Sequence, residues 1–421
     1  MPKPVKRLQP RSYHAFRCIG ADCEDTCCVG WIVQVDKSTY ENYQCCDDSE
    51  LGPRLHQLVT INSAPSDDNY ARMALNGPAC PFFTEGLCAI QKKLGEEYLP
   101  IMCSAYPRVM NIVDDVLQRS LDLSCPEAAR IVLLDPNPIE FDEEEGPPRD
   151  PRLANLSVLH TSNGTSDKPY EHFRAIRGFV IWLLQYRAFP LWKRLVILGS
   201  LCDRLQALTA AGRNSQVLEV LDAYRDAVDR DLGGQTLNNH APRPAAQLEL
   251  VLELIVGRIS SDFTGPRLLE CYQKFMQAMD WTVESSMNDI GRRYAAAHAE
   301  YYAPFLGRHE HMLEHYLVSY VHRTLFPLGP QESSRGQAVH HIAHSIGEQC
   351  LLMTVYYAIV QTLLIGVAAF HKTEFGKGHA IQVIQAFTKA FEHSPSFPGT
   401  GARNPRRQGD EKLRRAGEPR T

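Results

Sequence analysis

Apolar residues recur every three or four positions over most of the chain after residue 168, which is the spacing of amphipathic helices. Capping residues and helix breakers at the ends of these runs set the predicted boundaries. Strands do not alternate with the helices, so the pattern argues against a doubly wound α/β sheet. We predict helices over residues 170–186, 191–211, 215–229, 245–260, 266–279, 283–301, 309–325, 338–371 and 379–393.

Residues 351–370 form a nearly continuous apolar stretch of 20 residues, which is long enough to span a bilayer. Thr354, Gln361, Thr362 and Gly366 interrupt it. We favour a buried central helix and expect no membrane span, because the rest of the chain is composed like a soluble domain. A true span would make this a membrane protein.

The pattern before residue 135 is different, with short helices and irregular loops over residues 12–134, a strand-like stretch at 31–35 and a short helix at 126–134. Residues 135–168 carry several prolines and an acidic run, which predicts a linker. Residues 395–421 are basic and rich in Pro and Gly, which predicts a disordered tail. The expected fold is mainly α, with an N-terminal cysteine-rich metal-binding module followed by a helical region over residues 169–394.

Charge and cysteine usage narrow the class of protein. The chain of 421 residues has a formal net charge of −5, and no broad basic field suggests a nucleic-acid partner. Its first 16 residues are basic and Pro-rich and lack the apolar core of a secretory signal, so we expect a cytoplasmic protein. Thirteen cysteines in such a protein indicate metal or redox chemistry more than disulfides.

Ten of the thirteen cysteines lie before residue 126, and the spacing of eight of them defines a candidate metal site. Thiolates are soft ligands for zinc or iron–sulfur clusters, and turn-forming residues beside several of these cysteines would let the backbone wrap around a metal. Eight ligands could fill one four-cysteine site with spares, or two sites. The candidate ligands are Cys18, Cys23, Cys27, Cys28, Cys80, Cys88, Cys103 and Cys125.

The spacing matches no common motif, because the radical-enzyme, ferredoxin and CxxC patterns are all absent. Reduced structural thiols are therefore the alternative to a metal site. We interpret the vicinal pair Cys45–Cys46 as incidental, and Cys202, Cys271 and Cys350 as core residues.

A second metal motif is weaker. His311, Glu314 and His315 match the inverted zincin spacing H-x-x-E-H. So short a match readily arises by chance in a chain with 16 histidines, and a solvent-exposed helix face explains it equally well. The chain contains no GxGxxG or P-loop motif, so a Rossmann-type nucleotide site has no support.

Three N-terminal segments, FRCIGADCEDTCCVGW (16–31), CPFFTEGLCAIQKKLGEEYLPIMCSAYPR (80–108) and SLDLSCPEAAR (120–130), resemble the flagellin lysine-N-methylase family. So do HMLEHYLVSYVHRTLFPLG (311–329) and IQAFTKAFEHS (384–394). The resemblance implies methyl transfer from S-adenosylmethionine to lysine side chains of flagellin. It also implies a 4Fe–4S cluster on the cysteines, with zinc as the second choice of metal.

Methyl transfer to lysine requires a neutral amine, and at pH 7 this costs about 4–5 kcal/mol against a reference pKa near 10.4. Tyr106, Glu97 and Tyr316 are our candidates to take the proton. Arg108 is our candidate to hold the cofactor's carboxylate. Packing, surface and salt-bridge roles are the alternatives for these four residues.

Two other functions stay open on the sequence alone. One is a non-catalytic metal-binding protein whose helical scaffold docks a partner. The other is a zinc hydrolase that uses His311, Glu314 and His315. The cysteine site itself could be open, with three ligands and room for the cofactor, or closed and structural, with four.

Overall fold

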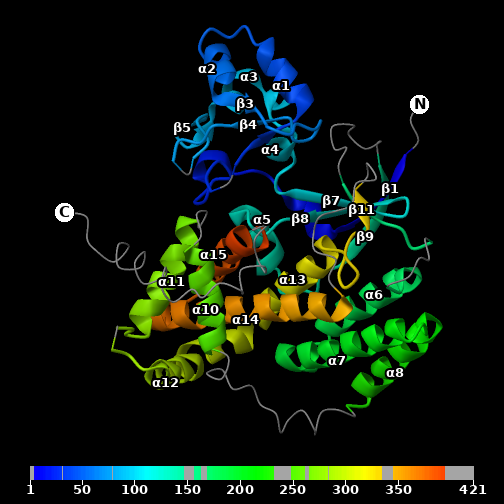
Figure 1. The fold of residues 1–421 in the computed structure, drawn as a ribbon. Coiled ribbons are helices and arrows are strands. Elements are labelled where there is room, and N and C mark those ends of the chain that lie inside the picture. The colour runs from blue at the N-terminus through cyan, green and yellow to red at the C-terminus, as the bar shows by residue number, and fades with distance from the viewer. Residues whose placement is uncertain are drawn as a thin grey trace.

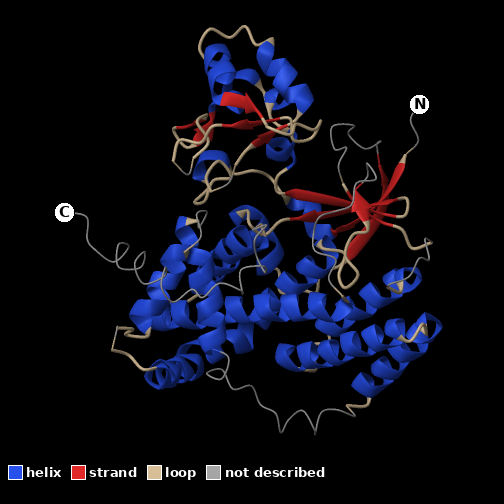
Figure 2. Cartoon of the chain, viewed as in Figure 1, coloured by secondary structure: helices blue, strands red, loops and turns tan. Residues whose placement is uncertain are grey.

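The computed structural model of the chain has two visibly different parts, a small mixed module and a larger helical region (Figure 1). The structure describes residues 4–30, 32–77, 79–146, 156–162, 168–231, 248–260, 265–282, 284–333 and 345–393. The predicted tail at 395–421 lies outside these residues. Helices dominate the described chain (Figure 2), which confirms the mainly α class.

The helical region contains the elements that the apolar periodicity predicts, with ends within a few residues of the predicted ones for most of them. Its helices are α6 (Phe173–Leu184), α7 (Leu191–Ala210), α8 (Val217–Asp229), α10 (Leu248–Ile259), α11 (Pro266–Ala278), α12 (Met287–Ala297), α13 (Ala303–Arg323), α14 (Ile346–His371) and α15 (Lys377–Phe387). Two short π-helical segments, His298–Tyr302 and Thr388–Glu392, continue the chain after α12 and α15.

The apolar stretch at 351–370 lies in α14, which runs through the middle of the helical region (Figure 1). Ser345 and Glu348 close its start with a capping box. The helix packs against α7, α10, α11 and α12. In the part of the chain that the structure describes, this helix alone is long and apolar enough to cross a membrane, and 67% of its most apolar window is buried. Such burial is what a core helix shows.

A six-stranded mixed sheet was not predicted. Its strand order is β11–β10–β7–β8–β1–β9, and the strands come from distant parts of the chain. The hairpin of β7 and β8 lies at its centre, and β1 runs parallel to β8. The strands are β1 (Val5–Pro10), β7 (Arg108–Val113), β8 (Val116–Leu121), β9 (Phe141–Gly146), β10 (Ser157–Leu159) and β11 (Glu332–Ser333).

The segment predicted as a linker therefore contributes two strands, β9 and β10. Its acidic run forms the edge strand β9, which pairs with the basic strand β1. Glu144 of β9 lies within ion-pair distance of Arg7 on the neighbouring strand β1 and of Arg119 on β8, the next strand beyond it. An edge strand can carry charges of this kind, so its local composition resembles that of a linker. The domain boundaries themselves stay a prediction.

The cysteine-rich module has a small core of its own, built on residues such as Val35, Tyr43, Leu55 and Phe82. A three-stranded sheet, a hairpin and short helices surround it. Its elements are α1 (Lys37–Gln44), α2 (Leu51–Leu58), α3 (Ala89–Leu94), α4 (Ile101–Ala105), β2 (Gln34–Val35), β3 (Val59–Ile61), β4 (Ala71–Met73), β5 (Phe83–Thr84) and β6 (Leu87–Cys88). Helix α5 (Pro126–Leu134) then packs against α13 and α15 of the helical region.

Candidate functional site

Five of the eight predicted metal-ligand cysteines line one cavity of about 80 Å³ in the small module. The hairpin of β5 and β6 turns at Glu85 and Gly86, both at positive φ, and so returns Cys88 to the neighbourhood of Cys80. The backbone N–H of Cys80 donates to the carbonyl of Cys28 over 2.8 Å, which joins the two loops. The five cysteines are Cys27, Cys28, Cys80, Cys88 and Cys103.

The thiol of Cys28 is hydrogen-bonded to the sulfur atoms of both Cys27 and Cys88 in this cavity. Hydrogen bonds from the Cys28 thiol lower the pKa of Cys27 to about 7 and that of Cys88 to about 6. Burial raises the pKa of Cys80 to about 11 and holds that of Cys103 well above its usual range. Two sulfurs thus carry negative charge near neutral pH beside a third that holds a proton. A soft cation could replace that proton.

The other three predicted ligands, Cys18, Cys23 and Cys125, form a separate group. Burial raises the pKa of Cys125 to about 12, and the charges of Cys23 and Cys18 raise it further. Within the described ranges, no three His, Cys, Asp or Glu side chains are arranged so that they could hold one metal ion. The choice between one site and two therefore stays open.

A contact from the C-terminal helix fastens the loop that carries Cys23, Cys27 and Cys28. Lys389 donates from Nζ to Asp25 Oδ1 over 2.8 Å and to the Thr26 carbonyl over 3.2 Å. Lys389 and Asp25 are both buried, with side chains only 6% and 7% exposed. We call this ion pair the loop latch.

Gln385, at the end of α15 just before the π-helical segment that carries Lys389, completes the attachment. Gln385 donates to Asp25 and to the Ser124 carbonyl, each over 2.7 Å, and so joins the cysteine loop to the turn before Cys125. The sequence analysis missed Gln385 and Lys389 as site residues. Both lie in IQAFTKAFEHS, one of the segments that carry the family resemblance, which was the available signal.

We expect Lys389→Met to release the cysteine loop. The change leaves the buried Asp25 carboxylate without its cation, and breaking a buried pair costs about 3–5 kcal/mol. Hydrogen–deuterium exchange followed by mass spectrometry should show faster exchange over residues 20–30. Lys377→Met, an exposed position on the same helix, is the control. Unchanged exchange in the Lys389 variant would contradict a latching role.

Tyr316, a predicted catalytic residue, is buried in a polar network under this region. Its hydroxyl donates to Glu392 Oε1 over 2.8 Å, and Glu392 forms an ion pair with Arg323. Arg323 also lies 3.8 Å from Asp122. Burial holds the pKa of Tyr316 well above its usual range, so the phenol keeps its proton at neutral pH.

Tyr106, the second predicted catalytic residue, reaches the same network from the cysteine cavity, whose wall it helps to form. Its hydroxyl lies 3.0 Å from Ser124 Oγ, and the Ser124 backbone N–H donates to Asp122 over 2.9 Å. Burial also holds the pKa of Tyr106 well above its usual range. A continuous set of polar contacts therefore joins Tyr106 to Tyr316, and both phenols keep their protons in this state.

The remaining two predicted site residues lie outside this network. Glu97 is exposed on a short turn after α3 and does not line the cavity. The Arg108 guanidinium lies over the Phe16 ring, 5.1 Å from its centre. No carboxylate in the described part of the chain pairs with Arg108 within 4.0 Å, so the structure does not show the salt bridge considered as its alternative role.

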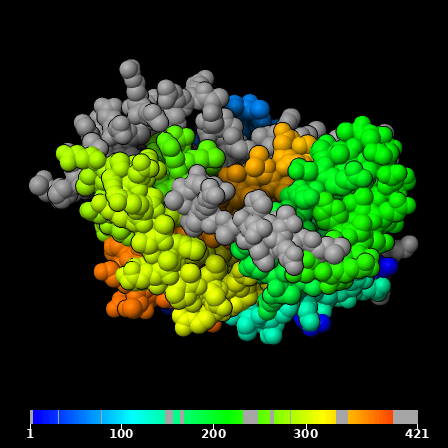
Figure 3. Space-filling model, turned by 90° about the horizontal axis from the view of Figure 1, so that it is seen from below, coloured from blue at the N-terminus to red at the C-terminus, as the bar shows by residue number. Residues whose placement is uncertain are grey.

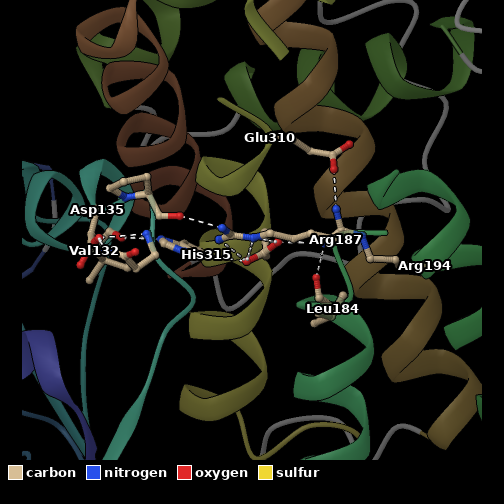
Figure 4. A network of polar contacts seen from close by, with 10 residues as sticks. Val132, Asp135, Leu184, Arg187, Arg194, Glu310 and His315 are labelled. Carbon is tan, nitrogen blue, oxygen red and sulfur yellow. Dashed lines mark hydrogen bonds and ion pairs between the residues drawn. The ribbon is translucent and has the colours of Figure 1, made fainter. Parts of the chain in front are cut away.

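The zincin-like triplet is part of a buried ion-pair network instead of a metal site (Figure 4). Glu314 accepts hydrogen bonds from Arg187 and Arg194, and the second of these pairs is 2.9 Å long with both side chains 1% exposed. His315 Nδ1 lies 2.8 Å from the Val132 carbonyl. The Glu314 carboxylate is thus neutralised by arginine, which leaves it unsuited to act as a base beside zinc.

Known proteins were compared with the chain. The family described as the FliB lysine N-methylase C-terminal domain matches residues 177–400, more than half of the chain. A lysine-N-methylase of Salmonella typhimurium is 27% identical over 197 residues, which cover 44% of this chain and 49% of that protein. A lysine-N-methylase of Salmonella choleraesuis matches to the same extent.

A third relative is the flagellar biosynthetic protein FliU of Salmonella muenchen, 30% identical over 146 residues, which cover 34% of this chain and 86% of that protein. The chain matches about half the length of the two lysine-N-methylases. No solved structure matches. The match over the helical region, together with the relatives, establishes that the chain belongs to the flagellin lysine N-methylase family.

Proposed function

We propose that this protein is a protein-lysine N-methyltransferase that methylates flagellin with S-adenosylmethionine in the cytoplasm. The observation that carries the proposal is the match of residues 177–400 to the lysine N-methylase C-terminal domain. The names of the relatives, a lysine-N-methylase and a flagellar biosynthetic protein, support lysine as the methylated residue and a flagellar protein as the substrate.

The proposed reaction is a direct displacement. The lone pair of a neutral lysine amine forms a bond to the methyl carbon, the carbon–sulfur bond breaks, and its electron pair goes to sulfur. The products are S-adenosylhomocysteine and a methylated ammonium group, which releases a proton to solvent or to a protein base. The positive sulfonium disfavours a neighbouring ammonium, so it lowers the pKa of the lysine before attack.

The placement of the predicted residues refines their roles. Tyr106 and Tyr316 keep their protons at neutral pH, so neither is a base in this state. Tyr106 lines the cysteine cavity and would orient a substrate there, whereas Tyr316 already donates its proton to Glu392. Glu97 is exposed and ionisable, so it is the candidate to accept a proton directly. No carboxylate of the described residues pairs with the Arg108 guanidinium, so it is available to a carboxylate of a ligand.

We also propose that the cysteine cavity holds an iron–sulfur cluster of the 4Fe–4S type. The donor set suits such a cluster, because five cysteines line one small cavity and two of them are acidic thiols. When bound, such a cluster would cross-link the cysteine loops and add folding free energy to a module with a small core. The protein's own part is to hold those loops in place through Lys389 and Gln385.

Protein purified without oxygen should therefore be coloured. We expect broad visible absorption together with iron and acid-labile sulfide in comparable amounts, because thiolate-ligated clusters absorb through charge transfer from sulfur to iron. The visible spectrum, the iron content and the acid-labile sulfide content of the same preparation measure this. A colourless preparation with stoichiometric zinc would show that the site binds zinc and not an iron–sulfur cluster.

Transfer of a labelled methyl group from S-adenosylmethionine to purified flagellin tests the function itself. We expect label on flagellin lysines, and none when the protein is heat-inactivated. Full metal content without any transfer to flagellin would instead favour a non-catalytic metal-binding protein that docks a partner.

A further inference from the structure

A second cavity lies away from the cysteines, inside the helical region. Its volume is about 500 Å³, compared with about 80 Å³ for the cysteine cavity. Small-molecule sites commonly measure about 300–1,000 Å³, so only the larger of these two cavities has room for a nucleoside-sized ligand. Every residue that lines it falls within the region 177–400 that matches the methylase family.

Three parts of the chain supply most of its walls. They are the segment before and at the start of α7, the stretch from α12 into α13, and the middle of α14. In the view of Figure 3, orange residues of α14 are seen between yellow-green residues on the left and green residues on the right.

The α12–α13 wall departs from regular helix at both of its ends. The turn His298–Tyr302 is π-helical, and His309 has non-helical backbone angles inside α13. Such irregular turns recur at functional sites, because they redirect side chains at the cost of local helix stability. Here they bracket the wall residues Ala303, Leu306 and Gly307.

The chemistry of the lining suits a cation that carries an aromatic base. Four aromatic residues line the cavity, Trp192, Phe189, Tyr294 and Tyr357, and aromatic rings support stacking and cation–π contact. The Lys193 ammonium already lies over the Phe189 and Trp192 rings. Gln361 donates to the Tyr357 hydroxyl over 3.4 Å and also hydrogen-bonds the Tyr302 hydroxyl. Its carbonyl oxygen can accept from the exocyclic amine of adenine.

The charges in and around the cavity balance without excluding a cation. Arg187 lines the cavity but is occupied by the buried Glu314, while the carboxylate of Glu310 lines it and pairs with Arg194. Burial lowers the pKa of His298, so its ring is neutral at pH 7 and does not repel a positive ligand. The lining therefore presents one arginine and one carboxylate, each already in an ion pair, together with four aromatic rings.

From these features we infer that this helical cavity, and not the surroundings of Arg108, is the binding site for S-adenosylmethionine. The inference rests on the proposed function, because it names the place where that function's methyl donor binds. Glu310 and the aromatic rings face the sulfonium and the amine, and Gln361 meets the adenine.

Gly307 allows a direct test by filling the cavity. A Cβ built at Gly307 meets no heavy atom within 4 Å, so Gly307→Phe adds a ring at the cavity wall without an immediate clash. Gly178→Phe in α6 is the matched control, since Gly178 is also an exposed helical glycine with open space and lies outside the cavity. Gln361→Leu removes the carboxamide at nearly constant volume.

Isothermal titration calorimetry with S-adenosylmethionine, on the full chain and without flagellin, reads binding independently of catalysis. We expect Gly307→Phe to abolish binding, Gln361→Leu to weaken it roughly tenfold, and Gly178→Phe to leave it unchanged. Wild-type binding that survives Gly307→Phe and is lost in Arg108→Gln would overturn the inference and leave the proposed function standing. No binding to the wild-type chain would overturn the proposed function itself.

Discussion

Glu314→Gln should lower the free energy of unfolding by about 3–5 kcal/mol, the usual cost of breaking a buried ion pair. Glu314 accepts from both Arg187 and Arg194, and Arg194 is 1% exposed. Without the carboxylate, Arg187 loses its ion pair and Arg194 keeps only its pair with Glu310. The uncompensated charge is buried among α6, α7 and α13, so the whole helical region should lose stability.

Chemical denaturation followed by circular dichroism measures this effect. His311→Ala is the control, because His311 is only part-buried and its Nε2 has no hydrogen-bond partner in the described structure. Its substitution should cost less than about 1 kcal/mol. If instead Glu314→Gln kept full stability while abolishing an activity, the zinc-hydrolase alternative would regain support.

Cys27→Ser should have the largest effect on the small module. Cys27 lies between the loop latch and the cysteine cavity, and its thiol is one of the two acidic ones. A module with a small core depends on ligand bonds for stability, so the loss of one ligand should release metal and loosen the fold. We expect lower soluble yield, loss of iron and new protease cleavage within residues 12–134. Cys103→Ser, at another wall of the same cavity, should act in the same way.

Limited proteolysis with mass spectrometry distinguishes this effect from general unfolding. The helical region from about residue 168 should remain as a resistant fragment. Cys45→Ser is the control, since Cys45 is exposed at the end of α1 and does not line the cavity. Identical digestion patterns and melting curves in Cys27→Ser, despite lost iron, would show that the metal does not stabilise the module.

The helices could be predicted from the sequence because each buries one face, and burial leaves a periodic apolar pattern. The core helix α14 is the clearest case, since its apolar stretch and capping residues both lie within one segment. The sheet could not be predicted in this way. Its edge strand β9 is acidic and depends on Arg7 and Arg119 from distant parts of the chain.

The candidate site shows the same limit. The cysteines themselves were identifiable by residue type, but their division into groups of five and three depends on the β5–β6 turn and on α15. Lys389 and Glu314 look like ordinary surface charges in a helical pattern. Their partners Asp25 and Arg194 lie more than a hundred residues away, so only the fold reveals that these charges are buried.

The central claim is that this chain adds methyl groups to flagellin lysines, and peptide mass spectrometry of flagellin tests it most directly. Flagellin should be isolated from cells that contain the wild-type chain, the Gly307→Phe variant or no copy of the chain. We predict methylated lysines with the wild-type chain, and unmodified lysines in the other two samples. Flagellin that stays unmodified in the presence of the folded, metal-loaded wild-type chain would contradict the account.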